Sequence, residues 1–250
     1  MSTLIILTVI LLIVIPIYIM YHFRVMLLPK SITGVAINIA MLCLMALVCF
    51  YLFKWDSAAL YYFAIIVFAV IMSAVTIRRS RLNVVRYIIP TSIGIIASSL
   101  IIGSLAMYAI LGGESLLHKY VVPFNALLII NMASVTGKTL YTYCSGLRYH
   151  HQLYNFLLGN GATHNEAVDY FFRRAVARAT AVATRNLSGF ISLSVVVFVT
   201  MMLCGIEPFT ALTKGIVILA AIYSSAFLAA IIALWFTRRY SFDRYSGLKE

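Results

Sequence analysis

The chain has 250 residues, of which 63% are hydrophobic and only 10% are charged, and its formal net charge is +12. This composition is far more apolar than that of a soluble domain, so it predicts a protein with several membrane spans. A positive charge could also indicate nucleic-acid binding, but the lysines and arginines cluster between the apolar runs, as they do in membrane proteins. We therefore expect no nucleic-acid partner.

Seven apolar runs approach or exceed the roughly 20 residues that a membrane-spanning helix needs. They are residues 3–21, 33–53, 57–76, 85–111, 120–143, 187–204 and 209–236. The first run has no preceding lysine or arginine and no small-residue cleavage pattern after it, so we expect a retained span and not a signal peptide. The prediction is an all-α polytopic fold with about seven transmembrane helices, forming a single permease domain over residues 1–250.

The basic residues predict the orientation. Fifteen of the 19 follow the first, third, fifth or seventh run; Lys54, Lys119 and Lys214 lie on the other side, and Lys138 lies within the fifth run. Because positive charge stays in the cytoplasm, the N-terminus is expected outside and the C-terminus inside, in the cell's inner (plasma) membrane.

The longest connection, about residues 144–186, is polar, basic and patterned. Gly159 and Gly161 interrupt the chain, and Thr163 stands three residues before Glu166. This T-x-x-E spacing is a capping box, in which the two side chains satisfy free amides at a helix start. A helix is therefore predicted to begin near His164.

Within that helix, four-residue spacing separates two faces. Small and aromatic residues form one face: Ala167, Phe171, Ala175 and Ala179. Arginines form the other: Arg174, Arg178 and Arg185. We expect a short amphipathic helix lying at the cytoplasmic surface. Its arginines could meet anionic lipid head groups, or the helix could dock a cytoplasmic partner. A catalytic loop is disfavoured, because the segment has no nucleophile and base arrangement.

Three stretches then resemble one family. The segment "GATHNEAVDYFFRRAV" is similar to the cytoplasmic loop of FetB-type ABC transporter permeases, a bacterial iron-export family related to plant aluminium-tolerance proteins. Its matching residues are Gly161, Ala162, Thr163, Ala167, Arg173 and Arg174. "CGIEPFTAL" (204–212) resembles the turn between the family's last two spans, and "VPFNALLIINMASVTG" (122–137) resembles a family span with Asn131 and Gly137. The chain departs from the family in residues 191–203 and 32–42, where a proline, a glycine, an arginine and a glutamine are missing.

The resemblance implies the membrane subunit of an ABC transporter, dimeric, driven by a separate cytoplasmic ATPase and exporting a metal ion such as iron. In such transporters a short cytoplasmic helix of the permease sits in a cleft of the ATPase. The implied coupling residues are Gly161, Ala162, Thr163, Glu166, Ala167, Phe171, Arg173, Arg174 and Arg178. Phe171 and Phe172 would be anchors, and the arginines would meet acidic ATPase side chains.

No enzymatic role, catalytic residue or cofactor is expected in this chain. Gly137-Lys138-Thr139 ends like a phosphate-binding loop, but that motif needs a glycine where Met132 stands, and the segment lies in an apolar run. Lys138 is expected to extend its side chain to the cytoplasmic interface. No metal site is expected either, since Glu114 and His118 offer only two neighbouring ligands.

Polar groups inside the spans are candidates for the transport pathway, because they are costly in lipid. The candidates are Asn38, Asn125 and Asn131, with Gly137 added by the resemblance. The amides could instead bond between helices. Ala221, Ser225 and Ala229, spaced by four, indicate a close helix contact.

Two other classes of function remain open. One is a transporter or channel that works without an ATPase, its basic helix lying on lipid. The other is a membrane scaffold that transports nothing.

Overall fold

Helix is the only regular secondary structure in the part of the chain that the structure describes. The computed structural model describes residues 11, 14, 16–18, 22–23, 28–55, 57–111, 117–188 and 193–241, without the side chains of residues 28–31, 38, 41, 117–119, 193 and 240–241. Most of the predicted first span, residues 3–21, lies outside the described residues. The all-α prediction is confirmed.

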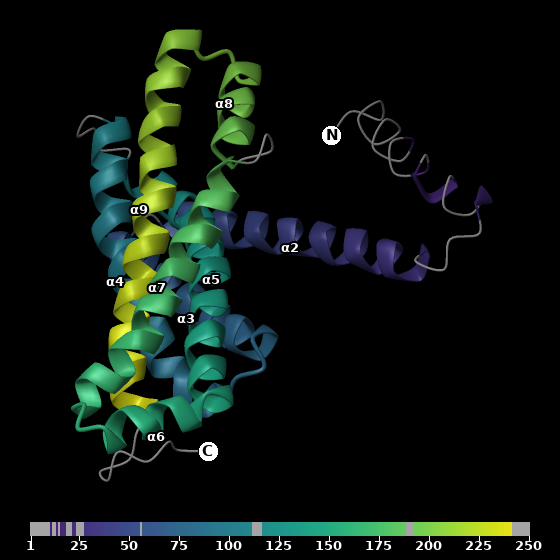
Figure 1. Ribbon diagram of the computed structural model, residues 1–250. Helices are drawn as coiled ribbons and strands as arrows, with labels where there is room; N and C mark the ends of the chain where they lie inside the picture. The colour runs from purple at the N-terminus through teal and green to yellow at the C-terminus, as the bar shows by residue number, and fades with distance from the viewer. Residues whose placement is uncertain are drawn as a thin grey trace. The chain divides into compact units, whose positions relative to one another are not determined.

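Eight helices are described (Figure 1). They are α2 (Leu28–Trp55), α3 (Ala58–Arg79), α4 (Val84–Leu111), α5 (Leu117–Tyr149), α6 (His151–Gly159), α7 (His164–Ser188), α8 (Leu193–Leu203) and α9 (Pro208–Ser241). Five stretches are long and apolar enough to cross a membrane: Ile32–Trp55, Ala58–Arg79, Val84–Leu111, Tyr120–Tyr149 and Pro208–Arg239. They match five of the seven predicted spans.

The predicted span at 187–204 is not one described helix. Helix α7 ends at Ser188, and α8 covers only Leu193–Leu203. Those 11 residues rise about 16 Å, roughly half the hydrocarbon thickness of a bilayer. Helix α8 alone is therefore too short to cross.

The chain divides into two units, residues 1–55 and 56–250. In the first, α2 is an apolar helix with none of its described side chains buried. In the second, helices α3, α4, α5, α7 and α9 pack into a bundle, with α6 lying across one end and the α8–α9 turn at the other (Figure 1).

Small residues let α4 and α9 approach closely. A Cβ atom added at Gly94 would lie 2.8 Å from the Ala229 carbonyl oxygen. Ala221, Ser225 and Ala229 are all buried. The predicted close helix contact is confirmed at Ala229, which lies against Gly94 of α4. Small residues are common at such contacts because packing, and not the hydrophobic effect, holds helices together in lipid.

Helix α7 differs most from its prediction. It has 25 residues instead of forming a short surface helix, and it packs against α5 and α9. The face found by the four-residue spacing is buried along the whole helix, from Ala167 to Ala183. Near its C-terminal end this face meets Val135 of α5 and Ala226 and Ala230 of α9. The four-residue spacing predicted the apolar face of α7 correctly. This face is covered by α5 and α9 of the same chain.

Candidate functional site

The α6–α7 turn is held by local hydrogen bonds. The Thr163 backbone N–H donates to Glu166 Oε2 at 2.8 Å, and the Glu166 N–H donates to Thr163 Oγ1 at 3.4 Å. The predicted capping box and the helix start at His164 are thus confirmed. The Thr163 N–H beside Glu166 holds the pKa of that carboxyl below its usual value.

Helix α6 ends just before this capping box in a Schellman arrangement. Gly161 has φ +88°, and the N–H groups of Gly161 and Ala162 donate to the carbonyls of Leu158 and Leu157. A glycine suits the left-handed position that this arrangement requires. Hydrogen bonds therefore satisfy backbone groups at both sides of the turn, at the end of α6 and at the start of α7.

Two further contacts fix the turn to the bundle, and the sequence did not reveal them. The Tyr154 hydroxyl of α6 lies 2.7 Å from His164 Nδ1, and Arg238 of α9 donates from Nη2 to Asn165 Oδ1 at 2.5 Å. Burial, and then the charge of Arg238, lower the pKa of His164, while burial raises the pKa of Tyr154. These residues join α6, α7 and α9 into one rigid end.

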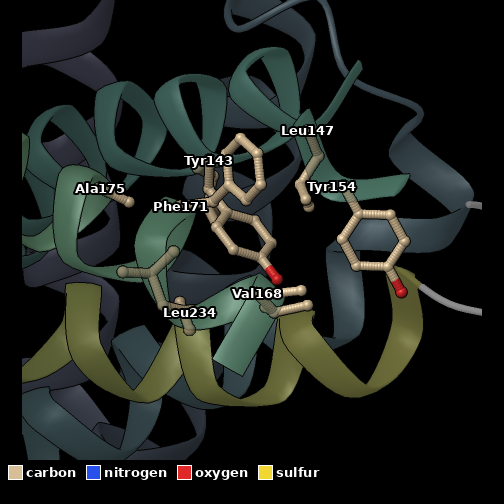
Figure 2. Close-up of a cluster of buried hydrophobic side chains, with 10 residues drawn as sticks. Tyr143, Leu147, Tyr154, Val168, Phe171, Ala175 and Leu234 are labelled. Carbon is tan, nitrogen blue, oxygen red and sulfur yellow. The ribbon is translucent and has the colours of Figure 1, made fainter. Parts of the chain in front are cut away.

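Phe171, one of the two expected ATPase anchors, is not at the surface of this chain. Its side chain is 1% exposed and lies in a cluster with Tyr143 and Leu147 of α5 and Leu234 of α9 (Figure 2). Phe172 is partly buried against the same cluster, and Ala167 is fully buried within it. The spacing of these residues therefore reflects packing of α7 on α5 and α9.

Other apolar side chains are exposed at this end of the bundle. Tyr149 at the end of α5 is 77% exposed, and Phe156 of α6 is 65% exposed; Leu153 is also exposed. We call these three residues the α6 surface. Leu153 and Phe156 lie outside the long apolar stretches that can face lipid, and Tyr149 is the last residue of one of them. Sequence reasoning missed this surface because residues 151–159 are too few to form a periodic pattern.

The arginines of α7 separate into two environments. Arg173 is exposed and pairs with Asp169 one turn earlier, with 2.8 Å between Nε and Oδ2. Arg174 and Arg178 instead line a cavity of about 720 Å³, together with Arg79, Arg81 and Lys138. We call this the basic cavity. Lys138 lies near the basic end of its span, where its side chain was expected to reach the interface.

Three of the candidate pathway residues, Asn125, Asn131 and Gly137, belong to the bundle, and each makes a separate contact. Asn131 joins three helices, because its Nδ2 donates to the Ile222 carbonyl of α9 at 3.1 Å and its Oδ1 accepts from Asn186 Nδ2 of α7 at 3.1 Å. This geometry is that of an amide bonding between helices. Asn186 was not anticipated, since it lies near the end of a segment that was expected at the surface.

Asn125 and Gly137 face other helices. Asn125 donates from Nδ2 to the Val121 carbonyl of its own helix at 2.9 Å and packs against Gly103 of α4, where a Cβ would have no room. Gly137 packs against Thr76 of α3, and the Ser80 hydroxyl donates to its carbonyl at 3.1 Å. Asn38 lies in α2, and its side chain is outside the described ones.

Residues 137–139 are helical and lie within α5, so they do not form a phosphate-binding loop. Within the described ranges, no group of three or more histidine, cysteine, aspartate or glutamate residues is placed to hold a metal ion.

These features define an all-α, multi-pass membrane protein with a rigid polar turn at one end of its bundle. A family model described as an uncharacterised protein family, UPF0014, matches residues 3–242. The chain belongs to this family, which comprises ABC-transporter-permease-like membrane proteins. No match was found among the curated proteins or the solved structures.

Proposed function

We propose that this chain is the membrane permease subunit of an ABC transporter, and that a separate ATPase docks on α6 and the start of α7. The observation that carries the proposal is the capped α6–α7 turn at the basic end of the bundle, which the positive-inside rule assigns to the cytoplasm. A docking element must hold its shape, because a small interface depends on a few well-placed side chains.

Exposure supports α6 as the docking helix. The α6 surface offers Phe156, which lies outside the apolar stretches, and Tyr149, which ends one of them, and aromatic side chains are enriched at interface hot spots. Glu166 and Arg173 are exposed nearby at the start of α7 and supply charge of both signs. Compared with the original expectation, the anchors shift from Phe171 and Phe172 to the α6 surface.

Connections from the turn into the bundle support coupling. Asn165 is bonded to Arg238 of α9, and Phe171 packs against Tyr143 of α5. A force applied to α6 would therefore reach two membrane-spanning helices through side chains that are already in contact. Gly161, Ala162 and Thr163 would set the angle of α6 and need not contact the ATPase themselves.

The substrate and assembly are proposed from the family resemblance. We propose a metal ion such as iron as the exported substrate and a homodimer as the working membrane unit. Asn125 and Asn131 serve within one chain as contacts between or along helices, so a pathway would be completed between two copies.

Co-purification tests the docking. The chain is expressed together with a candidate ABC ATPase, sought among the neighbouring genes, and complex formation and ATP hydrolysis are measured for wild type, Phe156→Asp and Phe209→Asp. Phe209 is the matched control, because it is 82% exposed and lies at the opposite end of the bundle (Figure 1). We expect Phe156→Asp to release the ATPase while Phe209→Asp retains it.

Two results would contradict this function. If neither the wild-type chain nor its variants bind the ATPase, the coupling proposal fails, and an ATPase-independent transporter or a scaffold is favoured. If both variants bind equally well, α6 is not the docking element. Metal accumulation in cells that lack both subunits then tests the substrate separately.

A further inference from the structure

The basic cavity brings five cationic side chains together from three parts of the bundle. Arg79 and Arg81 come from the α3–α4 turn, Lys138 from α5, and Arg174 and Arg178 from α7. Its lining contains no carboxylate. Within the described part of the chain, none of the five makes an ion pair. Like charges this close repel one another, so the arrangement favours an anion that neutralises them.

The size and lining of the cavity suit a phosphate-bearing group. About 720 Å³ is within the range of small-molecule sites, well beyond the needs of a single inorganic ion. Ala177 and Ala181 leave space between the arginines, and Tyr141 adds a hydroxyl group. Guanidinium groups bind phosphate oxygens with two parallel hydrogen bonds, which makes arginine the preferred residue for such anions.

The depth of the cavity indicates the source of the anion. Arg79 ends the apolar stretch of α3, and Lys138 follows Tyr120 of α5 by 18 residues, a rise of about 27 Å that nearly equals the hydrocarbon thickness of a bilayer. Both residues are thus expected at the level of the cytoplasmic head groups. The start of α7 extends beyond this level, since Arg174 lies ten residues, about 15 Å, after His164.

The turn that ends α3 positions Arg81 at the cavity. Arg81 has φ +54°, a left-handed position at the end of α3 where glycine is the usual residue. A side chain here costs the backbone free energy, and it places one more cation on the cavity. The turn itself is closed by backbone hydrogen bonds, from the Arg81 N–H to the Arg78 carbonyl and from the Leu82 N–H to the Ile77 carbonyl.

We propose that the basic cavity is a binding site for the phosphate group of an anionic phospholipid in the cytoplasmic leaflet. Basic pockets between membrane helices on this side of a bilayer suit such head groups. The site is separate from the α6 surface, because the α6 surface and the basic cavity share no residue. A soluble organic phosphate has the same chemistry, and the experiment includes pyrophosphate to distinguish the two sources.

Native mass spectrometry of the full-length chain in detergent tests the site with two short-chain lipids, phosphatidylglycerol and phosphatidylcholine, and with inorganic pyrophosphate. The test variant is Arg174→Gln/Arg178→Gln. The control is Arg148→Gln/Arg239→Gln, which removes two exposed arginines that do not line the cavity. Circular dichroism confirms that all variants keep their helices.

We expect phosphatidylglycerol to bind more tightly than phosphatidylcholine. Each lost charge should weaken that binding about fivefold, so the test variant should lose about 25-fold and the control only a few-fold. Equal losses in both variants would mean diffuse attraction to the surface and would overturn the site. Pyrophosphate that binds with the same dependence on Arg174 and Arg178, while the two lipids bind alike, would overturn the lipid assignment in favour of a soluble phosphate.

Discussion

Replacing Phe171 by alanine distinguishes packing from docking on α7. The side chain is 1% exposed, and its Cδ1 atom lies 3.4 Å from the position that a Cβ at Gly146 would take, so the ring fills the space beside a glycine of α5. Removing a buried phenylalanine ring costs about 3–5 kcal/mol, since the cavity left behind adds to the lost burial. That is a large share of the total stability of most proteins, about 5–15 kcal/mol.

The measurement is the free energy of unfolding in detergent micelles, with denaturation followed by circular dichroism. Tyr170→Ala is the matched control, because Tyr170 is the preceding aromatic residue of α7 and is 51% exposed. We expect its free energy of unfolding to change by no more than about 0.5 kcal/mol. ATPase binding is measured at a temperature where the Phe171→Ala protein is still folded.

A surface anchor and a core residue predict opposite results in this pair of assays. If Phe171→Ala unfolds like Tyr170→Ala but no longer binds the ATPase, the packing argument is refuted and Phe171 is an anchor after all. If the Phe171→Ala protein loses stability and still binds the ATPase while folded, Phe171 serves packing of the bundle and not docking.

Two further predictions concern the helix start and the helix contacts. Because Glu166 has a lowered pKa in the folded chain, its contribution to stability is present above the unfolded-state pKa of about 4.3 and is lost as the pH falls through the lower folded value. The difference in melting temperature between wild type and Glu166→Gln should therefore shrink between pH 6 and pH 3; a difference that grows would contradict the capping role. Gly94→Ala places a Cβ against backbone atoms of Ala229 and Ala233 and should cost about 1–3 kcal/mol of unfolding free energy in detergent. Gly34→Ala has no atom within 4 Å of its new Cβ and should not destabilise the chain, so equal effects of the two substitutions would argue against the α4–α9 contact.

Local sequence signals predicted local structure well. The T-x-x-E spacing located the start of α7, because a capping box is closed by residues three positions apart. Long apolar runs located five helices for a similar reason, since the length of a span is fixed by the bilayer.

The environment of each helix face could not be predicted in the same way. Ala167 and Phe171 form an apolar stripe whether lipid, an ATPase or the protein's own α5 and α9 covers it, and a single sequence does not distinguish these. The same limit applies to Arg174 and Arg178, whose cavity depends on Arg79 and Arg81 from a turn nearly 100 positions away. Contacts between distant segments are set by packing, which leaves no spacing signal in the chain.

The distribution of residues along α7 explains how one helix can serve three purposes. Its first turn carries Glu166 at the end of the bundle, its middle carries Arg174 at the expected head-group level, and its last turns place Asn186 against Asn131 of α5. Glu166 and Asn186 are 20 residues apart, a distance of about 30 Å along a straight helix. Since one face of α7 is buried against α5 and α9 from Ala167 to Ala183, we expect a displacement of the α6 end to be passed to those two helices. A lipid held at Arg174 and Arg178 would then act as a fixed point between the docking end and the Asn131–Asn186 contact, so the lipid composition of the membrane should alter how effectively ATPase docking moves the bundle.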